Sequence, residues 1–368
     1  MNRLLNVAIV VLVAALAYLL FWPVPITAVS WQAPTFAGYA GVHARNDRLA
    51  RLRIVSVAPE IGPEHIVFGP DGKLYTGVLS GKVLRMNLDG TEVEQFVDTD
   101  GRPLGLDFDR DGRLLVADAE RGLLATGPGG AVVVLADSVA LEPIVYADAV
   151  KVAADGKIVF TDATTRFAAR DYGTFDAALY DVLEHSCTGR VLEFDPAAKA
   201  TRIVATGLCF PNGVAMTADE RGLIVAETGA YRILRLAREA EALDVRKALA
   251  GADPAVRVLL DDLPGFPDNV TRGDGRYWVG LTKPRSSKID AWAGRPWLRE
   301  LTLRLPRALW PVPPAYGHVI AFDETGRVLA DLQDPTGRLA ETSGVTEYNG
   351  QLYVQSLHAE AFGMLPSP

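Results

Sequence analysis

Cysteine is scarce in this sequence, since only Cys187 and Cys209 occur among its 368 residues. Two cysteines are too few for a small domain held together by disulfides, and no Cys-x-x-Cys or cysteine–histidine spacing is typical of a zinc site. Basic residues are also outnumbered, with 37 Lys and Arg against 45 Asp and Glu. The positive charge that accompanies nucleic-acid binding is therefore missing.

A serine-nucleophile motif is missing as well. No Gly-x-Ser-x-Gly sequence occurs in the chain, so a serine esterase is not supported. Apolar residues, by contrast, are abundant, because 49% of the residues are hydrophobic and 22% are charged. This composition supports a sizeable core and excludes wholesale disorder.

The longest apolar run lies near the N-terminus, from Val7 to Trp22. Its length is close to the roughly 17 to 25 residues with which a helix crosses a bilayer. Arg3 precedes the run, and Pro23 ends it. Because no clear small-x-small cleavage site follows, we expect residues 1–25 to form an uncleaved membrane anchor and not a cleaved signal peptide. The positively charged Arg3 then stays on the cytoplasmic side of the membrane, and the chain after the anchor lies on the periplasmic or extracytoplasmic side.

One pattern recurs six times along the rest of the chain: a short apolar run, a turn, and a second apolar run. The turns are Asp71-Gly72, Asp111-Gly112, Asp155-Gly156, Asp219 to Gly222, Asp274-Gly275 and Asn349-Gly350. Asp-Gly and Asn-Gly between apolar runs are typical of tight β-hairpins. Two further strand-like runs lie between successive copies, so each repeat predicts a four-stranded blade.

Six such repeats predict an all-β fold, a six-bladed β-propeller over residues 49–368 with an N-terminal transmembrane helix and a linker over residues 26–48. The sixth copy is one strand short, and residues 49–57 can supply that strand and close the ring. A β-sandwich is the alternative, but it gives no reason for one hairpin to recur six times.

The residue just before the first strand of each blade is expected at the mouth of the central channel. Four of these six positions carry a carboxyl or amide group, namely Glu64, Asp148, Asn212 and Asp268. Each alone would be an ordinary turn or cap residue. Carboxylates that converge on one axis repel each other unless a cation neutralises them. Their hard oxygen donors favour Ca²⁺ or another divalent cation, so the four residues are a candidate metal site.

Motifs around these positions are distinctive. They are Pro63-Glu64-His65-Ile66, Phe210-Pro211-Asn212-Gly213-Val214, Gly265-Phe266-Pro267-Asp268-Asn269 and Tyr277-Trp278-Val279-Gly280. In these motifs the chain closely resembles the strictosidine synthase-like family, from about residue 49 to the C-terminus. The resemblance implies a six-bladed propeller allied to gluconolactonase (regucalcin) and paraoxonase.

The resemblance also implies a ligand set. The allied lactonases hold a calcium or similar ion through a Glu, two Asn and an Asp. Glu64, Asn212 and Asp268 match these positions, whereas Asp148 stands where the lactonases have Asn. Strictosidine synthase itself uses a glutamate just before the inner strand of blade six, where this chain has Thr342-Ser343-Gly344. We therefore do not expect its condensation chemistry.

The expected function is that of a membrane-anchored, metal-dependent hydrolase of small esters or lactones, of the lactonase or arylesterase type. A bound ion would polarise a carbonyl and orient a water molecule. By analogy with the lactonases, Asp268 is the expected water-activating carboxylate, and His65 is a candidate second base or else a packed core histidine. The rival hypothesis is a non-catalytic propeller with a structural calcium ion, whose mouth binds a ligand or a partner.

Two long connections between second and third strands are expected on the face of the site. Residues 163–188 contain an amphipathic helix pattern and are expected to form a lid. Residues 283–317 contain three tryptophans, and could form an apolar substrate wall, a membrane-resting surface or plain packing. The hairpin between Cys187 and Cys209 places both cysteines at its open end, as a disulfide or as two buried thiols.

Overall fold

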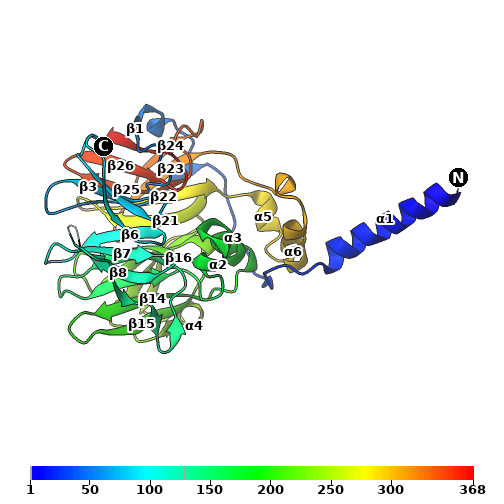
Figure 1. Ribbon diagram of the computed structural model, residues 1–368, viewed down its shortest axis with the longest axis horizontal. Coiled ribbons are helices and arrows are strands. Elements are labelled where there is room, and N and C mark those ends of the chain that lie inside the picture. The colour runs from blue at the N-terminus through cyan, green and yellow to red at the C-terminus, as the bar shows by residue number, and fades with distance from the viewer. Residues whose placement is uncertain (1, 128–129) are drawn as a thin grey trace.

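The computed structural model contains six sheets of four or five mainly antiparallel strands, packed into one body (Figure 1). The structure describes residues 2–127 and 130–368. The first strand of each blade is the innermost, since β12 contacts both β6 and β16, the first strands of the neighbouring blades. The predicted six-bladed β-propeller is thereby confirmed.

The strands of a blade follow one another along the chain. Blades one and two contain β2 (Ile66–Phe68), β3 (Leu74–Gly77), β4 (Lys82–Met86) and β5 (Glu94–Asp98), then β6 (Pro103–Phe108), β7 (Leu114–Asp118), β8 (Gly122–Thr126) and β9 (Val133–Ala136). A small hairpin of β10 (Ser138–Val139) and β11 (Glu142–Pro143) precedes blade three. Blade three contains β12 (Ala147–Val152), β13 (Ile158–Asp162), β14 (Gly189–Asp195) and β15 (Ala200–Leu208), to which β19 (Leu243–Asp244) adds in parallel.

Blades four and five continue this order. They contain β16 (Pro211–Met216), β17 (Gly222–Glu227), β18 (Arg232–Ala237) and β20 (Val256–Leu260), then β21 (Gly265–Arg272), β22 (Tyr277–Pro284), β23 (Gly317–Phe322) and β24 (Val328–Asp334). Neighbouring blades share buried aliphatic clusters, such as the one that contains Val191 of blade three and Val225 of blade four. Burial of this apolar surface between blades stabilises the ring.

Blade six is built from both sides of the chain. β25 (Thr342–Tyr348), β26 (Gln351–Ser356) and β27 (Ala361–Pro366) come from the C-terminal part, and β1 (Arg53–Ser56) comes from the segment before blade one. β1 pairs antiparallel with β27, with Arg53 opposite Met364. The closing strand predicted within residues 49–57 is thus confirmed.

The hairpin of blade six shows how an Asn-Gly turn joins two strands. Its turn residues Asn349 and Gly350 both have positive φ, 49° and 71°. A two-residue type I′ turn requires positive φ at both positions, and Asn-Gly meets this requirement at low cost. The turn therefore sets the register in which β25 and β26 pair.

The inner strands β16 and β21 approach each other very closely. A Cβ atom on Gly213 would lie 2.0 Å from the backbone nitrogen of Val270. Only glycine fits at such an approach. The close packing brings Asn212 of β16 near Asp268 of β21, so the final glycine of the Phe-Pro-Asn-Gly motif serves the geometry of the channel mouth.

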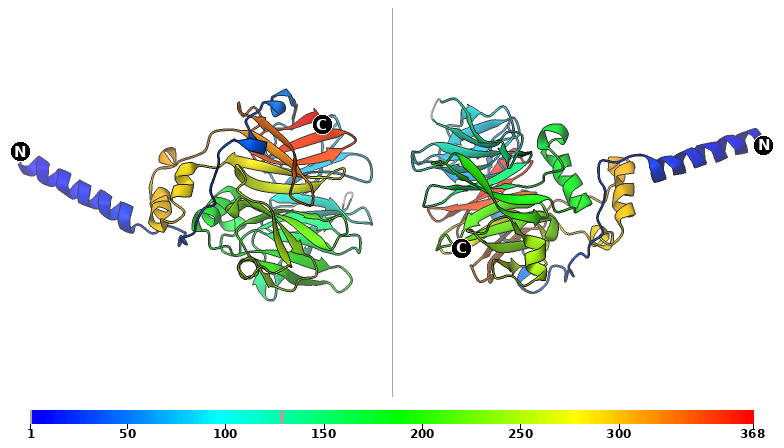
Figure 2. Two further views of the ribbon diagram at one scale, coloured as in Figure 1. Left: turned by 180° about the vertical axis from the view of Figure 1, so that it is seen from behind. Right: turned by 90° about the horizontal axis from the view of Figure 1, so that it is seen from below.

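Helical insertions lie at one end of the propeller, on the side from which α1 (Asn2–Phe21) extends (Figure 2). Between β13 and β14 lie α2 (Ala169–Tyr172) and α3 (Thr174–Glu184), and between β22 and β23 lie α5 (Ser287–Ala291), α6 (Pro296–Arg304) and the 3₁₀ turn η4 (Arg307–Leu309). α3 contacts α6, whereas α4 (Val245–Ala250) packs against β15 and β20. A further 3₁₀ turn, η3 (Thr228–Ala230), follows β17.

The helix α1 projects away from the propeller (Figure 1). Its residues Arg3–Phe21 are long and apolar enough to cross a membrane, and none of this window is buried. The end of the helix meets α6, where Arg304 Nε donates a hydrogen bond to the Trp22 carbonyl at 2.7 Å. The helix is a candidate membrane span, although a signal sequence has the same length and composition.

The chain between α1 and β1 lies along the propeller. The Val29 N–H donates to the Glu184 carbonyl at the end of α3, at 2.8 Å, and the Trp31 N–H donates to the Ala293 carbonyl at 3.2 Å. Further on, η1 (Gly41–His43) and η2 (Arg48–Arg51) contact β24. Residues 26–48, for which we expected a linker, therefore hydrogen-bond to both helical insertions.

We expect Gly213→Ala to lower the free energy of unfolding by about 1 to 3 kcal/mol, because the added methyl group overlaps the backbone of the next blade. The measurement is denaturant unfolding of the full-length protein in detergent. Gly127→Ala is the matched control, since a Cβ atom there meets nothing within 4 Å. Equal destabilisation of the two variants would contradict the role given to Gly213.

Candidate metal centre

One cavity at the end of the channel collects side chains from several inner strands. Glu64, Asp148, Asn212 and Asp268 all line this cavity, which has a volume of about 90 Å³. They come from blades one, three, four and five. The equivalent position in blade six is occupied by Ser343, whose Oγ donates to the Glu64 carbonyl at 2.6 Å. The propeller thus brings together four side chains that are far apart in the sequence.

Each of the four side chains has one buried oxygen without a hydrogen-bond partner in the described part of the chain. These atoms are Glu64 Oε2, Asp148 Oδ1, Asn212 Oδ1 and Asp268 Oδ1. None of the four residues is more than 5% exposed. A buried polar atom without a partner costs about 1 to 3 kcal/mol, so four at one place are not explained by packing alone. Carboxylate and amide oxygens are the donors that Ca²⁺ prefers, and the set fits a divalent cation.

Burial raises the pKa of the three carboxyl groups. The pKa of Glu64 is raised to about 7 by burial, although the charge of Arg102 and a hydrogen bond from Asn269 act in the opposite direction. The pKa values of Asp148 and Asp268 are raised well above the ordinary value, first by burial and then by the negative charge of Glu64. A cation bound among these groups would favour their charged forms.

Neighbouring polar side chains orient the candidate ligands. Asn269 Nδ2 donates to Glu64 Oε1 at 2.6 Å and to the Glu64 carbonyl at 3.1 Å. Thr161 Oγ1 donates to the Asn212 carbonyl at 2.8 Å. These bonds fix the backbone of Asn212 and leave Oε2 of Glu64 free, as expected for groups that support metal ligands.

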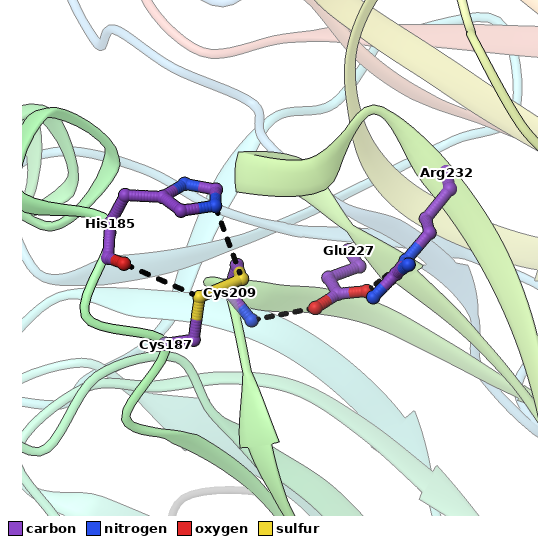
Figure 3. Close-up of a disulfide and its surroundings, with 5 residues drawn as sticks. All are labelled: His185, Cys187, Cys209, Glu227 and Arg232. Atoms are coloured by element: carbon purple, nitrogen blue, oxygen red, sulfur yellow. Dashed lines mark hydrogen bonds and ion pairs between the residues drawn. A yellow bond between two sulfur atoms is a disulfide. The ribbon is translucent and has the colours of Figure 1, made fainter. Parts of the chain in front are cut away.

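A disulfide joins Cys187 and Cys209 (Figure 3). Cys209 lies three residues before Asn212 in the sequence. The predicted proximity of the two cysteines is confirmed, and they are paired. The Cys209 N–H also donates to Glu227 Oε1 at 2.8 Å. The disulfide and this hydrogen bond tie the helical insertion to the strand that carries Asn212.

The insertion of residues 163–188 contributes to the wall of the cavity, as expected of a lid. Thr174, Phe175 and Ala178 of α3 line it. No residue of the other insertion, 283–317, lines this cavity. In the described structure α6, which belongs to this insertion, packs against α3 and α1.

Arg102 is a lining residue that the sequence analysis missed. Its Nη2 lies 3.5 Å from the Gly62 carbonyl, and its Nε and Nη1 have no partner among the residues described. Burial lowers the pKa of Arg102, whereas the charge of Glu64 raises it. The repeat assigns Leu104 to this position in blade two, and the long arginine side chain reaches the cavity from two residues earlier. No local sequence pattern predicts that the Arg102 side chain extends into the cavity.

His65 is not among the lining residues of the cavity. Its Nδ1 accepts a hydrogen bond from the Leu106 N–H of blade two at 3.0 Å. Burial lowers the pKa of His65 to about 3. A neutral histidine that bridges two blades corresponds to the packed alternative, so we give His65 no part in the chemistry below.

The fold and the donor set define a class: a six-bladed propeller whose channel ends in clustered oxygen donors. A solved gluconolactonase from Xanthomonas campestris is similar, with a TM-score of 0.61 and 20% identity over 93% of this chain and 97% of that chain. A calcium-binding regucalcin from Agrobacterium tumefaciens has a TM-score of 0.57 and 13% identity over 85% of this chain and 92% of that chain. At these identities the likeness shows the fold alone.

Sequence comparisons identify the family. The profile "Strictosidine synthase-like, N-terminal" matches residues 41–86, and the profile "Strictosidine synthase" matches residues 148–240. Protein STRICTOSIDINE SYNTHASE-LIKE 13 of Arabidopsis thaliana is 31% identical over 332 residues, which cover 80% of this chain and 78% of that protein. Human adipocyte plasma membrane-associated protein is 30% identical over 345 residues, or 87% of this chain and 78% of that protein. The chain belongs to the strictosidine synthase-like family.

We expect Ca²⁺ binding near pH 7 to release about one to two protons per ion. Without a cation, the raised pKa of Glu64, about 7, means that this carboxyl still holds a proton in a large fraction of molecules. The cation favours the charged form, so the proton leaves, and its release fades as pH rises above the pKa. Calorimetric titration of the chelator-treated full-length protein in two buffers with different ionisation enthalpies measures this release.

Two variants accompany the calorimetry. Glu64→Gln removes a titrating group and is expected to weaken binding and reduce proton release. Asp274→Asn is the control, because Asp274 is exposed in the hairpin turn of blade five. Heats of binding that do not depend on the buffer would contradict the expected proton release.

Proposed function

We propose that this protein is a divalent-cation-dependent hydrolase of small esters or lactones. The observation that carries the proposal is the set of four unpartnered oxygens on Glu64, Asp148, Asn212 and Asp268 in one cavity. The likeness to a gluconolactonase, and to a regucalcin described as calcium-binding, supports the choice of reaction and of Ca²⁺.

In this proposal the four residues hold the ion. A bound divalent cation supplies Lewis acidity to the substrate carbonyl and to a water molecule. Asp268, a lining residue with an unpartnered Oδ1, accepts the proton of the attacking water and returns it to the leaving oxygen. The Arg102 guanidinium, with two nitrogens free of partners in the described structure, stabilises the negative charge that develops on the carbonyl oxygen.

The lining of the cavity favours substrates with an apolar part. Its apolar side chains include Leu79, Leu104, Phe175, Phe210 and Leu357. Phe175 belongs to α3, which closes part of this space. A small lactone or an aryl ester presents the carbonyl to the polar end and its hydrocarbon part to these side chains.

A second candidate function is a non-catalytic propeller with a structural ion and a ligand- or partner-binding mouth. The observation that favours it is the size of the cavity, about 90 Å³, against roughly 300 to 1,000 Å³ for typical small-molecule sites. Catalysis on anything but a very small substrate then requires α3 to move. Turnover measurements separate the two functions.

We further propose that α1 anchors the protein in a membrane, with Arg3 inside and the propeller on the periplasmic or extracytoplasmic side. The disulfide between Cys187 and Cys209 supports this side, because disulfides persist in oxidising compartments. The name of the adipocyte plasma membrane-associated relatives points to a membrane location for those proteins. α6 contacts α1 and would then lie close to the bilayer surface.

We expect Asp268→Asn to lower kcat for lactones and aryl esters by about 100-fold or more, since the carboxylate that accepts the proton is lost. A chelator is expected to abolish turnover, and added Ca²⁺ to restore it. The measurement is hydrolysis of a substrate panel by the full-length protein. Asp274→Asn serves as the control in the same blade. If the folded, calcium-loaded protein hydrolyses none of the substrates in the panel, the result would favour the non-catalytic candidate.

The membrane proposal has its own test. Lys247 is exposed in α4, with 85% of its side chain accessible, so Lys247→Cys is expected to react with a membrane-impermeant maleimide in intact cells. The full-length protein is also expected to stay in the membrane fraction after an alkaline carbonate wash. Labelling only after lysis would place the propeller on the other side, and release by carbonate would exclude a spanning anchor.

A further inference from the structure

A second cluster of metal-binding side chains lies at the outer edge of blade five. It consists of His43 in η1, His318 in β23 and Asp331 in β24. His43 Nδ1 lies 2.7 Å from Asp331 Oδ2, and His318 Nε2 lies 2.9 Å from the same oxygen. Three potential ligand atoms from three elements thus lie within 4.8 Å of one another.

The Asp331 carboxylate is held in place by hydrogen bonds to its second oxygen, Oδ1. Asp331 Oδ1 accepts hydrogen bonds from Asn46 Nδ2, at 3.3 Å, and from Gln333 Nε2. Gln333 Oε1 in turn accepts a hydrogen bond from the Tyr316 hydroxyl at 2.6 Å. Oδ2 is therefore left for the two imidazoles. A fixed carboxylate with an outer layer of hydrogen bonds is typical of built metal sites.

Burial distinguishes this cluster from a chance group on the surface. The side chains of His318 and Asp331 are 2% and 5% exposed, and that of His43 is 18% exposed. Two buried polar atoms beside the cluster, His318 Nδ1 and Tyr39 Oη, have no partner within the described ranges. The Tyr39 and His318 rings lie 5.9 Å apart between centroids. The packing thus leaves polar groups that hydrogen bonds within the protein do not satisfy.

We propose that His43, His318 and Asp331 bind a Zn²⁺ ion. With zinc–ligand distances of about 2.0 to 2.2 Å and tetrahedral angles, two ligand atoms lie about 3.3 Å apart. The two nitrogen–oxygen distances of 2.7 and 2.9 Å need to open by only about half an ångström to reach this value. Two imidazole nitrogens and one carboxylate oxygen suit zinc, whereas an all-oxygen set suits calcium. Water completes the coordination on the partly exposed side of His43.

The ion would join the segment before β1 to the body of the propeller. His43 and Asp331 are 288 residues apart in the sequence, so no local spacing motif announces the site. The sequence lacks the cysteine–histidine spacing of zinc sites whose ligands are close together in the chain. That absence does not exclude a zinc site whose ligands come from distant segments. Here η1 lies against β24, and bound zinc would hold it there as a structural cross-link.

The test uses the full-length protein in detergent, stripped of metal with a chelator and then titrated with ZnCl₂ alone. We expect His43→Gln and Asp331→Asn each to bind about one zinc ion fewer per chain than the unchanged protein, or to bind it at least tenfold more weakly. His358→Gln removes a partly exposed histidine outside the cluster and is expected to retain the ion. Asp268→Asn is also expected to retain it, so the result does not depend on the channel site.

Cobalt provides an independent readout. Co²⁺ in a four-coordinate site gives intense visible absorption, which we expect in the unchanged protein and in His358→Gln but not in His43→Gln. Zinc is also expected to raise the melting temperature of the unchanged protein and not that of His43→Gln. Equal zinc content and equal cobalt spectra in the unchanged protein and His43→Gln would overturn the proposal and leave a hydrogen-bonded His–Asp–His group.

Discussion

Buried negative charge at the end of the channel is the constraint on which the rest of this structure depends. Three carboxyl groups and one amide oxygen face a small cavity, and each keeps an oxygen without a partner in the described residues. Such an arrangement is unfavourable unless protons or a cation neutralise it. Gly213, Asn269 and the disulfide between Cys187 and Cys209 all hold strands or side chains of this cluster in place.

The sequence predicts the parts of the molecule that repeat. The Asp-Gly and Asn-Gly turns predict the hairpins, and counting back from them places Glu64 and Asp268 at equivalent positions, because a propeller repeats one geometry. Arg102 escapes this reasoning, since its long side chain reaches the cavity from outside the repeated position. The contact between His43 and Asp331 escapes it too, because it joins segments 288 residues apart that share no pattern.

The two helical insertions have different roles although they occur at equivalent points of their blades. α3 lines the cavity, whereas α6 fills the space between α3 and the end of α1. Both lie on the side of the propeller from which α1 extends (Figure 2). Amphipathic composition alone does not distinguish a helix that lines a cavity from one that packs behind it, since both bury one apolar face.

Ring closure has a consequence for biosynthesis. β1 pairs with β27, and the partners Arg53 and Met364 are 311 residues apart. During translation, β1 is synthesised before the other strands of the propeller, and its partner β27 is synthesised after them. The edge of β1 that pairs with β27 therefore stays unpaired during most of translation. A premature stop before Ala361 would therefore remove the strand that pairs with β1 and leave the ring open.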